Sequence, residues 1–163
     1  MTLTAYDFNG VHITPMDRER DLAHVMSLSD EGFNVLGDYQ NTITDWVLRP
    51  EVATLVARRE QAIDGFITYA YIDDGEMTRG EIIALAVASA RRGRGIGRML
   101  MNRAIDALDE GAEALGLQGI YLTVAEGNTA AHPLFNALQF YPCGQDGVYP
   151  NGQRAVRMKR RNS

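Results

Sequence analysis

A stretch rich in glycine and arginine at residues 91–98 has the composition of an anion-binding loop. It follows an apolar run at residues 82–88 and precedes a run whose apolar residues recur at helical spacing. The first backbone N–H groups of a helix lack internal partners and lie at the positive end of the helix dipole, so they attract anions. Three glycines would let a phosphate approach the backbone and would permit positive φ angles: Gly93, Gly95 and Gly97. Three arginines would add phosphate contacts: Arg92, Arg94 and Arg98.

Three phosphate-binding patterns compete for this stretch. The Walker pattern ends in Gly-Lys-Ser/Thr, and no glycine here precedes a lysine. The dinucleotide pattern Gly-x-Gly-x-x-Gly needs its third glycine one position after Gly97, and it expects an acidic residue where the chain has Leu115. The third pattern, Arg/Gln-x-x-Gly-x-Gly/Ala, is matched in full by Arg92-Gly93-Arg94-Gly95-Ile96-Gly97. A glycine-rich turn that binds no ligand is the alternative.

On this pattern the chain resembles the GNAT superfamily of acyl-CoA-dependent N-acetyltransferases, in which the loop holds the pyrophosphate of coenzyme A. The family commonly continues with Asn-x-x-Ala-x-x-Leu-Tyr-x-x-Leu-Gly-Phe. The matching positions here are Asn128, Ala131, Leu134, Phe135, Leu138, Gln139 and Phe140. The resemblance covers about residues 53–160. It implies an acyltransferase that moves the acetyl group of acetyl-CoA to a primary amine by direct attack through a tetrahedral intermediate, without a metal.

The resemblance also assigns roles to residues. Glu81 is the predicted general base, because an alkyl ammonium with a pKa near ~10.4 must lose a proton before it attacks. A bulge around residues 85–87 is expected to splay that strand and to aim a backbone N–H at the thioester oxygen. The resemblance places the acceptor wall at residues 30–34 and 38–39, where acidic side chains could hold a cationic acceptor, and a surface loop without a ligand role is the alternative. The predicted cofactor-binding residues are Leu85, Ala86, Val87, Arg92, Gly93, Arg94, Gly95, Ile96, Gly97, Arg98, Asn128 and Phe135. A solvated Glu81 at a strand end and an Asn128 that only caps a helix are the alternatives.

Phe135 departs from the family pattern, which often has a tyrosine there to protonate the leaving thiolate. Phenylalanine cannot donate a proton, although a thiol pKa near ~8.5 makes the thiolate a tolerable leaving group. Tyr121 is the predicted catalytic substitute, with Tyr141 and Tyr149 as alternatives. The departure keeps a second function open, a non-catalytic regulatory module that binds acyl-CoA. A third reading is an unrelated α/β protein without affinity for coenzyme A.

The expected elements place these residues on one mixed sheet. Helices are expected from Asp17, over residues 42–48 and 96–115, and from Asn128, with a turn-rich loop at residues 29–41. The unit around the helix at 96–115 implies a parallel strand pair. Strands are expected at residues 11–14, 53–57, 66–72, 81–87, 119–124, 140–143 and 154–158. The fold class is therefore α/β (α+β mixed). We expect a single GNAT-like domain over residues 1–163, with a mostly antiparallel twisted sheet of six or seven strands and about four helices. The resemblance adds that the parallel pair splays at the cofactor site.

Composition limits the class of protein. A length of 163 residues fits one domain. The 21 acidic and 16 basic residues give a net charge of −5, which argues against a general nucleic-acid binder. The single cysteine, Cys143, excludes a disulfide framework and fits a reducing cytoplasm. No apolar run is long enough to span a bilayer, and the N-terminus lacks the features of a signal peptide. We expect a cytoplasmic protein whose partners are acetyl-CoA and an amine, with no nucleic acid or membrane. The resemblance adds a homodimer as an expectation, since the GNAT fold often forms one. The sequence does not choose the acceptor amine.

Overall fold

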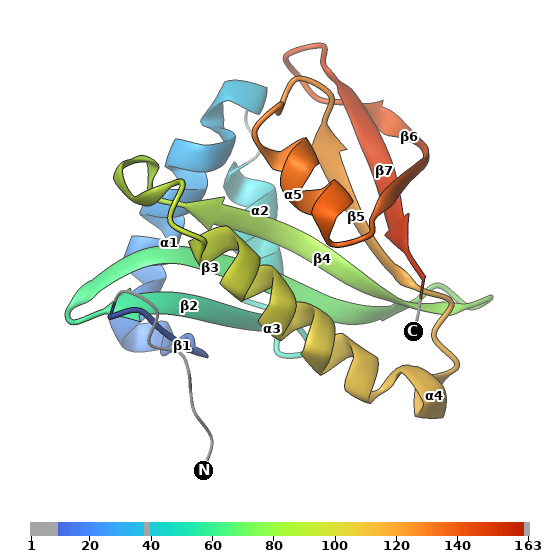
Figure 1. The fold of residues 1–163 in the computed structure, drawn as a ribbon, viewed down its shortest axis with the longest axis horizontal. Coiled ribbons are helices and arrows are strands. Elements are labelled where there is room, and N and C mark those ends of the chain that lie inside the picture. Colours follow the sequence, from blue (N-terminus) through green and yellow to red (C-terminus); the bar gives the residue numbers. More distant parts are fainter. Residues whose placement is uncertain (1–9, 38–39, 162–163) are drawn as a thin grey trace.

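The computed structural model describes residues 10–37 and 40–161, which form one seven-stranded sheet with helices on both faces (Figure 1). The strand order is β1-β2-β3-β4-β5-β7-β6, and every neighbouring pair is antiparallel except β4 and β5. The strands are β1 (His12–Pro15), β2 (Ala53–Arg59), β3 (Ala62–Asp73), β4 (Thr78–Val87), β5 (Ile120–Ala125), β6 (Tyr141–Val148) and β7 (Arg154–Arg160). The predicted mixed, mostly antiparallel sheet is confirmed.

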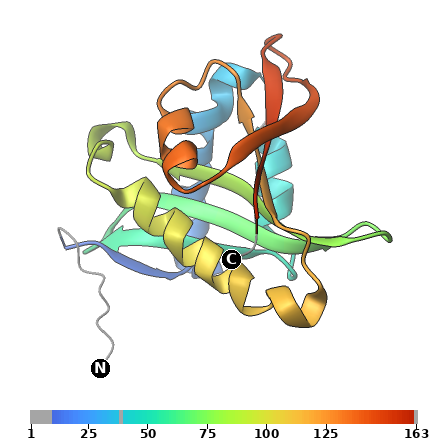
Figure 2. The same cartoon turned by 45° about the vertical axis from the view of Figure 1, so that its right-hand side comes forward.

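The helices divide between the two faces of the sheet (Figure 2). One apolar cluster joins α3 and α5 to the sheet, and a second joins α1 and α2 to the opposite face. The α-helices are α1 (Arg18–Phe33), α2 (Gln40–Val47), α3 (Ile96–Glu110), α4 (Ala112–Leu115) and α5 (Ala131–Ala137), and the short 3-10 turns are η1 (Asn34–Leu36) and η2 (Ser89–Arg91). Within the described ranges, no helix has both the length and the apolar run that a bilayer crossing requires.

Helix α1 is longer than expected and reaches the sheet near the predicted site. Asp17 caps its start as predicted, since its carboxylate accepts hydrogen bonds from the N–H groups of Glu19 and Arg20, both at 3.1 Å. The expectation of a loop from residue 29 is wrong, because the helix continues through Gly32 to Phe33. A Cβ atom on Gly32 would lie 3.3 Å from the Cβ of Ala86. The glycine therefore lets the end of α1 pack closely on β4.

The single helix expected over residues 96–115 is interrupted at Gly111. The hydroxyl of Tyr71 on β3 donates to the carbonyl oxygens of Ala107 and Leu108, at 3.0 and 3.1 Å. The same hydroxyl would lie 2.5 Å from a Cβ atom on Gly111. Leu115, at the end of the range expected to be helical, falls in the short α4 and is 46% exposed.

Strands β4 and β5 pair only where they begin. The parallel register runs from Gly80↔Ile120 to Ile82↔Leu122, after which β4 continues to Val87 and β5 to Ala125. The predicted splayed pair is therefore confirmed. Its bulge lies earlier than the expected residues 85–87, because the register between β3 and β4 shifts between Thr68 and Tyr69 and leaves Ile83 without an opposite residue. The shift comes directly after the last parallel pair, at the point where the strands separate.

Candidate functional site

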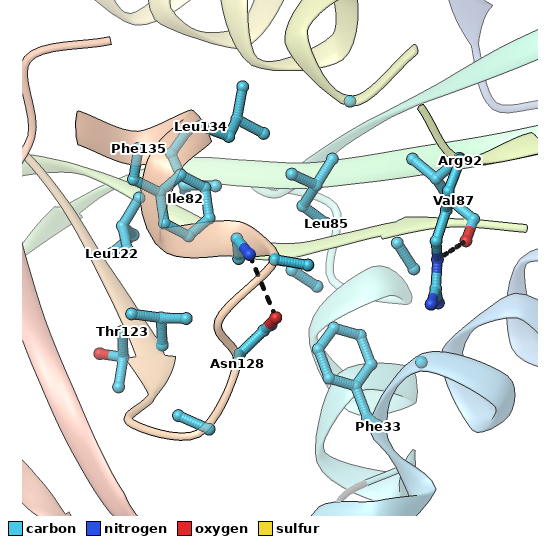
Figure 3. Close-up of a pocket in the computed structure, with 18 of the residues that line it drawn as sticks. Phe33, Ile82, Leu85, Val87, Arg92, Leu122, Thr123, Asn128, Leu134 and Phe135 are labelled. Atoms are coloured by element: carbon cyan, nitrogen blue, oxygen red, sulfur yellow. Dashed lines mark hydrogen bonds between the residues drawn. The ribbon is translucent and has the colours of Figure 1, made fainter. Parts of the chain in front are cut away.

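A cavity of about 660 Å³ occupies the gap between β4 and β5 (Figure 3). On one face of the sheet it is lined by α5 and by the start of α3. On the other face it is lined by the end of α1, by η1 and by the loop between β6 and β7. All the predicted cofactor-binding residues except Arg94 line this cavity, so the structure brings them together. Their binding roles stay predictions.

The loop that precedes α3 has the shape of an anion site. Gly93 and Gly95 have φ angles of 78° and 83°, in the left-handed region that favours glycine. Gly95 is the N-cap of α3 and has no side chain with which to cap the helix, and the residues at this helix start, Gly95, Ile96 and Gly97, line the cavity. Gly97 differs from the expectation, since it lies inside α3 and does not have a positive φ. Its missing side chain instead lets Leu134 lie close to the helix, since the Cδ2 of Leu134 would be 3.5 Å from a Cβ atom on Gly97.

Arginine side chains gather at this end of the cavity. Arg91, Arg92 and Arg98 contribute to its lining, whereas Arg94 is exposed outside it. The Nε of Arg92 donates to the carbonyl oxygen of Val87 at 3.2 Å, which fixes the side chain across the end of β4 (Figure 3). The loop can therefore offer both backbone N–H groups and guanidinium groups to a phosphate.

A buried carboxylate that the sequence analysis missed, Asp64, fixes the segment before the loop. Its side chain is 4% exposed and accepts hydrogen bonds from Arg59 at 2.9 and 3.2 Å and from Arg91 at 3.2 Å. Its carbonyl oxygen accepts from the N–H of Ala88 at 2.8 Å. The hydrogen bonds that Arg59 donates to Asp64 raise the pKa of Arg59 above its ordinary value. Asp64 thus ties β3 to η2, from which the glycine loop begins.

The backbone of Leu85 and Val87 faces the gap. Successive residues of a strand point their N–H and C=O groups to opposite edges. The N–H of Ala88 bonds to Asp64 on β3, so the groups of Val87 and Leu85 point the other way, toward β5. The bond from Arg92 to the Val87 carbonyl agrees with this direction. These groups occupy the place expected for pairing with an extended ligand and for stabilising an oxyanion.

Asn128 has the first of the two roles that the sequence left open, and its position is compatible with the second. Its Oδ1 accepts a hydrogen bond from the N–H of Ala131 at 3.2 Å, which caps the start of α5 (Figure 3). Asn128 also lines the cavity, as the contact with a cofactor would require. Phe135 on α5 is 6% exposed and meets Phe140 edge-on, with ring centroids 6.2 Å apart. Phe135 therefore gives the cavity an apolar wall.

Glu81 and Tyr121, the predicted catalytic residues, face each other in the paired part of β4 and β5, and neither lines the cavity. Both carboxylate oxygens of Glu81 accept from Arg157, at 2.6 and 2.7 Å, and one also accepts from Arg79 at 3.0 Å. The Glu81 side chain is 14% exposed, so it is not the solvated strand-end residue of the alternative. Burial acts to lower the pKa of Arg157, but its hydrogen bonds to Glu81 outweigh burial and keep that pKa above its ordinary value.

Arg157 connects this pair to the cavity. Its Nη1 donates to the hydroxyl of Thr123 at 3.1 Å, and Thr123 lines the cavity beyond the splay. The guanidinium also lies 4.9 Å from the ring centroid of Tyr121. The sequence analysis missed both Arg157 and Thr123. No local pattern signals a contact between Arg157 and Glu81, which are separated by 76 positions.

The side of the cavity opposite α3 matches the expected acceptor wall in part. Phe33 lines it, whereas Asp38 and Tyr39 lie outside the described residues. Glu31 turns toward the cofactor loop instead, where its carboxylate accepts from the N–H of Ser89 at 2.7 Å, and this hydrogen bond lowers its pKa. Lining residues that the sequence analysis missed are Val35, Leu36 and Gln153. In the described part of the chain, no group of three His, Cys, Asp or Glu side chains is placed to hold a metal ion.

The sequence matches the Acetyltransferase (GNAT) family over residues 20–140. A comparison with curated proteins found no match. Arabidopsis thaliana NAA60 in complex with a bisubstrate analogue superposes with a TM-score of 0.75 and 17% identity, covering 94% of this chain and 99% of that chain. The ribosomal-protein-S18-alanine N-acetyltransferase from Escherichia coli superposes with a TM-score of 0.73 and 20% identity, covering 94% of this chain and 94% of that chain. The paia N-acetyltransferase from Thermoplasma acidophilum in complex with coenzyme A superposes with a TM-score of 0.72 and 16% identity, covering 93% of this chain and 98% of that chain. These structural likenesses concern the fold.

Proposed function

Because the chain belongs to the Acetyltransferase (GNAT) family, we propose that it transfers the acetyl group of acetyl-CoA to a primary amine. One observation carries the proposal. The anion-binding start of α3 and the splayed backbone of β4 open into one continuous cavity. A pyrophosphate fits the first feature, and an extended arm that ends in a thioester fits the second.

Different residues of the cavity would bind the pyrophosphate and the arm of acetyl-CoA. The N–H groups at Gly95 and at the start of α3 would hold the pyrophosphate, with Arg92 and Arg98 beside it. The gap-facing groups of Leu85 and Val87 would pair with the arm and donate to the thioester oxygen. When bound, acetyl-CoA supplies a carbonyl carbon that a neutral amine can attack. Solved structures of similar fold that hold coenzyme A or acetyl-CoA support this choice of donor.

Two proton transfers accompany the reaction. For the amine proton we keep Glu81 as the proposed base, which would act across Thr123 through water, because Arg157 occupies both its oxygens. For the proton that the leaving thiolate takes up, Tyr121 stays the proposed donor, and Tyr149, which lines the cavity, is its competitor. If Tyr121 donates, the Tyr121→Phe variant will lower kcat without changing the affinity for acetyl-CoA.

The test is amine-dependent thiol release. The purified protein is mixed with acetyl-CoA and a panel of primary amines, free coenzyme A thiol is followed, and the acetylated amine is identified by mass spectrometry. We expect release that depends on both the amine and the protein, and its loss in the Gly95→Asp variant. Binding of acetyl-CoA without release, on a broad panel, would contradict the enzyme and support the non-catalytic module that Phe135 leaves open.

Two further properties are proposed from composition and family. The cytoplasm is the proposed location, since the single cysteine, Cys143, is free and exposed. A homodimer is the proposed assembly, and sedimentation of the purified protein will give its mass in solution. A monomer across the tested concentrations would contradict the dimer.

A further inference from the structure

The side of the cavity opposite α3, here called the acceptor half, presents mainly apolar side chains. Phe33, Val35 and Leu36 come from the end of α1 and from η1, and Ile83 comes from the splayed part of β4. Val35 is 67% exposed although it lines the cavity, so it stands at the rim. A large apolar side chain at the mouth of a cavity gains most when a ligand covers it.

Two polar side chains in this half, Thr123 and Gln153, are engaged with the protein. The hydroxyl of Thr123 accepts from Arg157 at 3.1 Å, and the Oε1 of Gln153 accepts from the N–H of Gly127 at 3.0 Å. These hydrogen bonds turn the Thr123 hydroxyl and the Gln153 Oε1 toward the cavity walls and away from the space for an acceptor. The surface left to an acceptor is therefore largely apolar.

Carboxylates near the acceptor half are engaged within the protein. Of the residues that the structure describes, no aspartate or glutamate lines the cavity. Three neighbouring carboxylates in the described ranges have partners: Glu81 binds Arg157, Glu31 accepts from the Ser89 N–H, and Glu126 binds Arg154 at 3.3 Å. A second ammonium group on an acceptor would lose hydration water on entering the cavity. No carboxylate among the described lining residues would compensate for that loss.

The wall is pinned from two distant parts of the chain. The side chain of Asn151, in the loop between β6 and β7, donates to the carbonyl oxygen of Val35 at 3.0 Å. Its backbone N–H donates to the carbonyl oxygen of Leu36 at 3.3 Å. The apolar rim is thus held in place before an acceptor arrives, which favours a defined shape of substrate.

We propose that the acceptor is a primary amine with an uncharged, apolar substituent, and that polycationic amines are poor acceptors. This inference rests on the proposed function. An apolar lining disfavours the ammonium form and lowers the pKa of a bound amine, which favours the neutral nucleophile. The amine nitrogen then forms a bond to the acetyl carbon and the carbon–sulfur bond breaks. One amine proton is released, and the leaving sulfur takes up one proton.

The substrate test compares primary amines that differ in the substituent they carry. Phenethylamine and isoamylamine represent free apolar amines, a short peptide with an N-terminal leucine represents a chain end, and spermidine represents a polycation. We expect kcat/KM for at least one apolar source to exceed that for spermidine by about tenfold or more. The arms show whether the source is a small amine or a peptide. A preference for spermidine would overturn the inference while leaving the acetyltransferase standing.

A matched pair of variants tests the wall itself. Val35→Asp places a carboxylate at the rim, and Val148→Asp places the same charge on β6 outside the lining, at a valine of similar exposure, 63% against 67%. We expect Val35→Asp to reduce the ratio of kcat/KM for phenethylamine over spermidine about tenfold, and Val148→Asp to change it less than about twofold. Equal effects of the two variants would overturn the role of the wall.

Binding without turnover separates the two proposals. Calorimetry of phenethylamine and of spermidine against the protein saturated with coenzyme A needs no catalysis. We expect heat of binding for phenethylamine and a weaker affinity for spermidine. If no amine is acetylated, the proposed function fails, and this titration still decides the chemistry of the cavity. Tighter binding of spermidine would overturn the inference.

Discussion

Arg157 binds both carboxylate oxygens of Glu81, with Nη1–Oε2 and Nη2–Oε1 distances of 2.6 and 2.7 Å. The pair spans from β7 to β4 across β5, and Glu81 lies one residue before the last parallel pair, Ile82↔Leu122. It buries a charge-assisted, bidentate contact beside the candidate active site. The pair therefore stabilises the point from which the two strands separate.

Removal of Arg157 should destabilise the protein. Arg157→Leu leaves Glu81, 14% exposed, without its main partner, and we expect a loss on the order of 3 kcal/mol in the free energy of unfolding, measured with urea. The matched control is Arg154→Leu, which breaks the exposed pair with Glu126 and should cost less than about 1 kcal/mol. Equal losses in the two variants would show that the Glu81–Arg157 pair does not support the fold.

Glu81→Gln tests the proposed base while keeping the size and a hydrogen-bonding group. We expect kcat/KM to fall at acidic to neutral pH by about 100-fold, and the deficit to shrink at alkaline pH, where the free amine needs no base. The affinity for acetyl-CoA should stay unchanged. A pH–rate profile that matches the wild type would remove Glu81 from the mechanism.

Gly95→Asp tests the anion loop. The substitution puts a side chain at a φ of 83° and a negative charge beside the expected pyrophosphate, and we expect at least about a 100-fold loss of affinity for acetyl-CoA. Gly75→Asp is the control, since Gly75 has a φ of 93° in the β3–β4 turn and open space around it. It imposes similar backbone strain away from the cavity. A similar affinity loss in both variants would point to general damage instead of loss of the loop.

Acid should weaken the protein through Asp21. Its carboxylate is 1% exposed and accepts from Arg58 at 2.6 Å. Burial acts to raise its pKa, but hydrogen bonds from Arg58 and from the Asp17 N–H outweigh burial and lower the pKa below 3.8. The folded state then binds fewer protons than the unfolded state, so this stabilisation is present above the unfolded pKa and is lost as the pH falls through the folded pKa.

Thermal melts of Asp21→Asn against wild type check this sign. We expect the variant to melt lower at pH values above about 5, and the difference to narrow below about pH 4. Asp106→Asn, on the exposed face of α3, makes the same charge change as a control and should shift the melting temperature little. A gap between Asp21→Asn and wild type that stays constant into strong acid would contradict the assignment.

The fold was predictable where the pattern is local. Alternation gave the strands, and the strand–helix–strand unit gave the parallel pair, because both depend on neighbouring residues. The interruption at Gly111 depends on Tyr71, forty positions away, and α1 passes through Gly32 because Ala86 receives it. Contacts of this kind have no signature in the sequence around either residue.

The site divides in the same way. The glycine loop was predictable because its residues are consecutive and their backbone chemistry is local. The pairing of Glu81 with Arg157, the engagement of Thr123 and the pinned rim at Val35 all arise where distant strands and loops meet.

Calorimetric titration of the purified protein with acetyl-CoA, with ATP as the control ligand, tests whether the cavity binds an acyl-CoA donor. We predict one-to-one binding of acetyl-CoA with a Kd in the micromolar range, about −8 kcal/mol, and much weaker binding of ATP. A folded protein that binds neither ligand, or that binds both equally, would contradict the assignment of the cavity to an acyl-CoA donor.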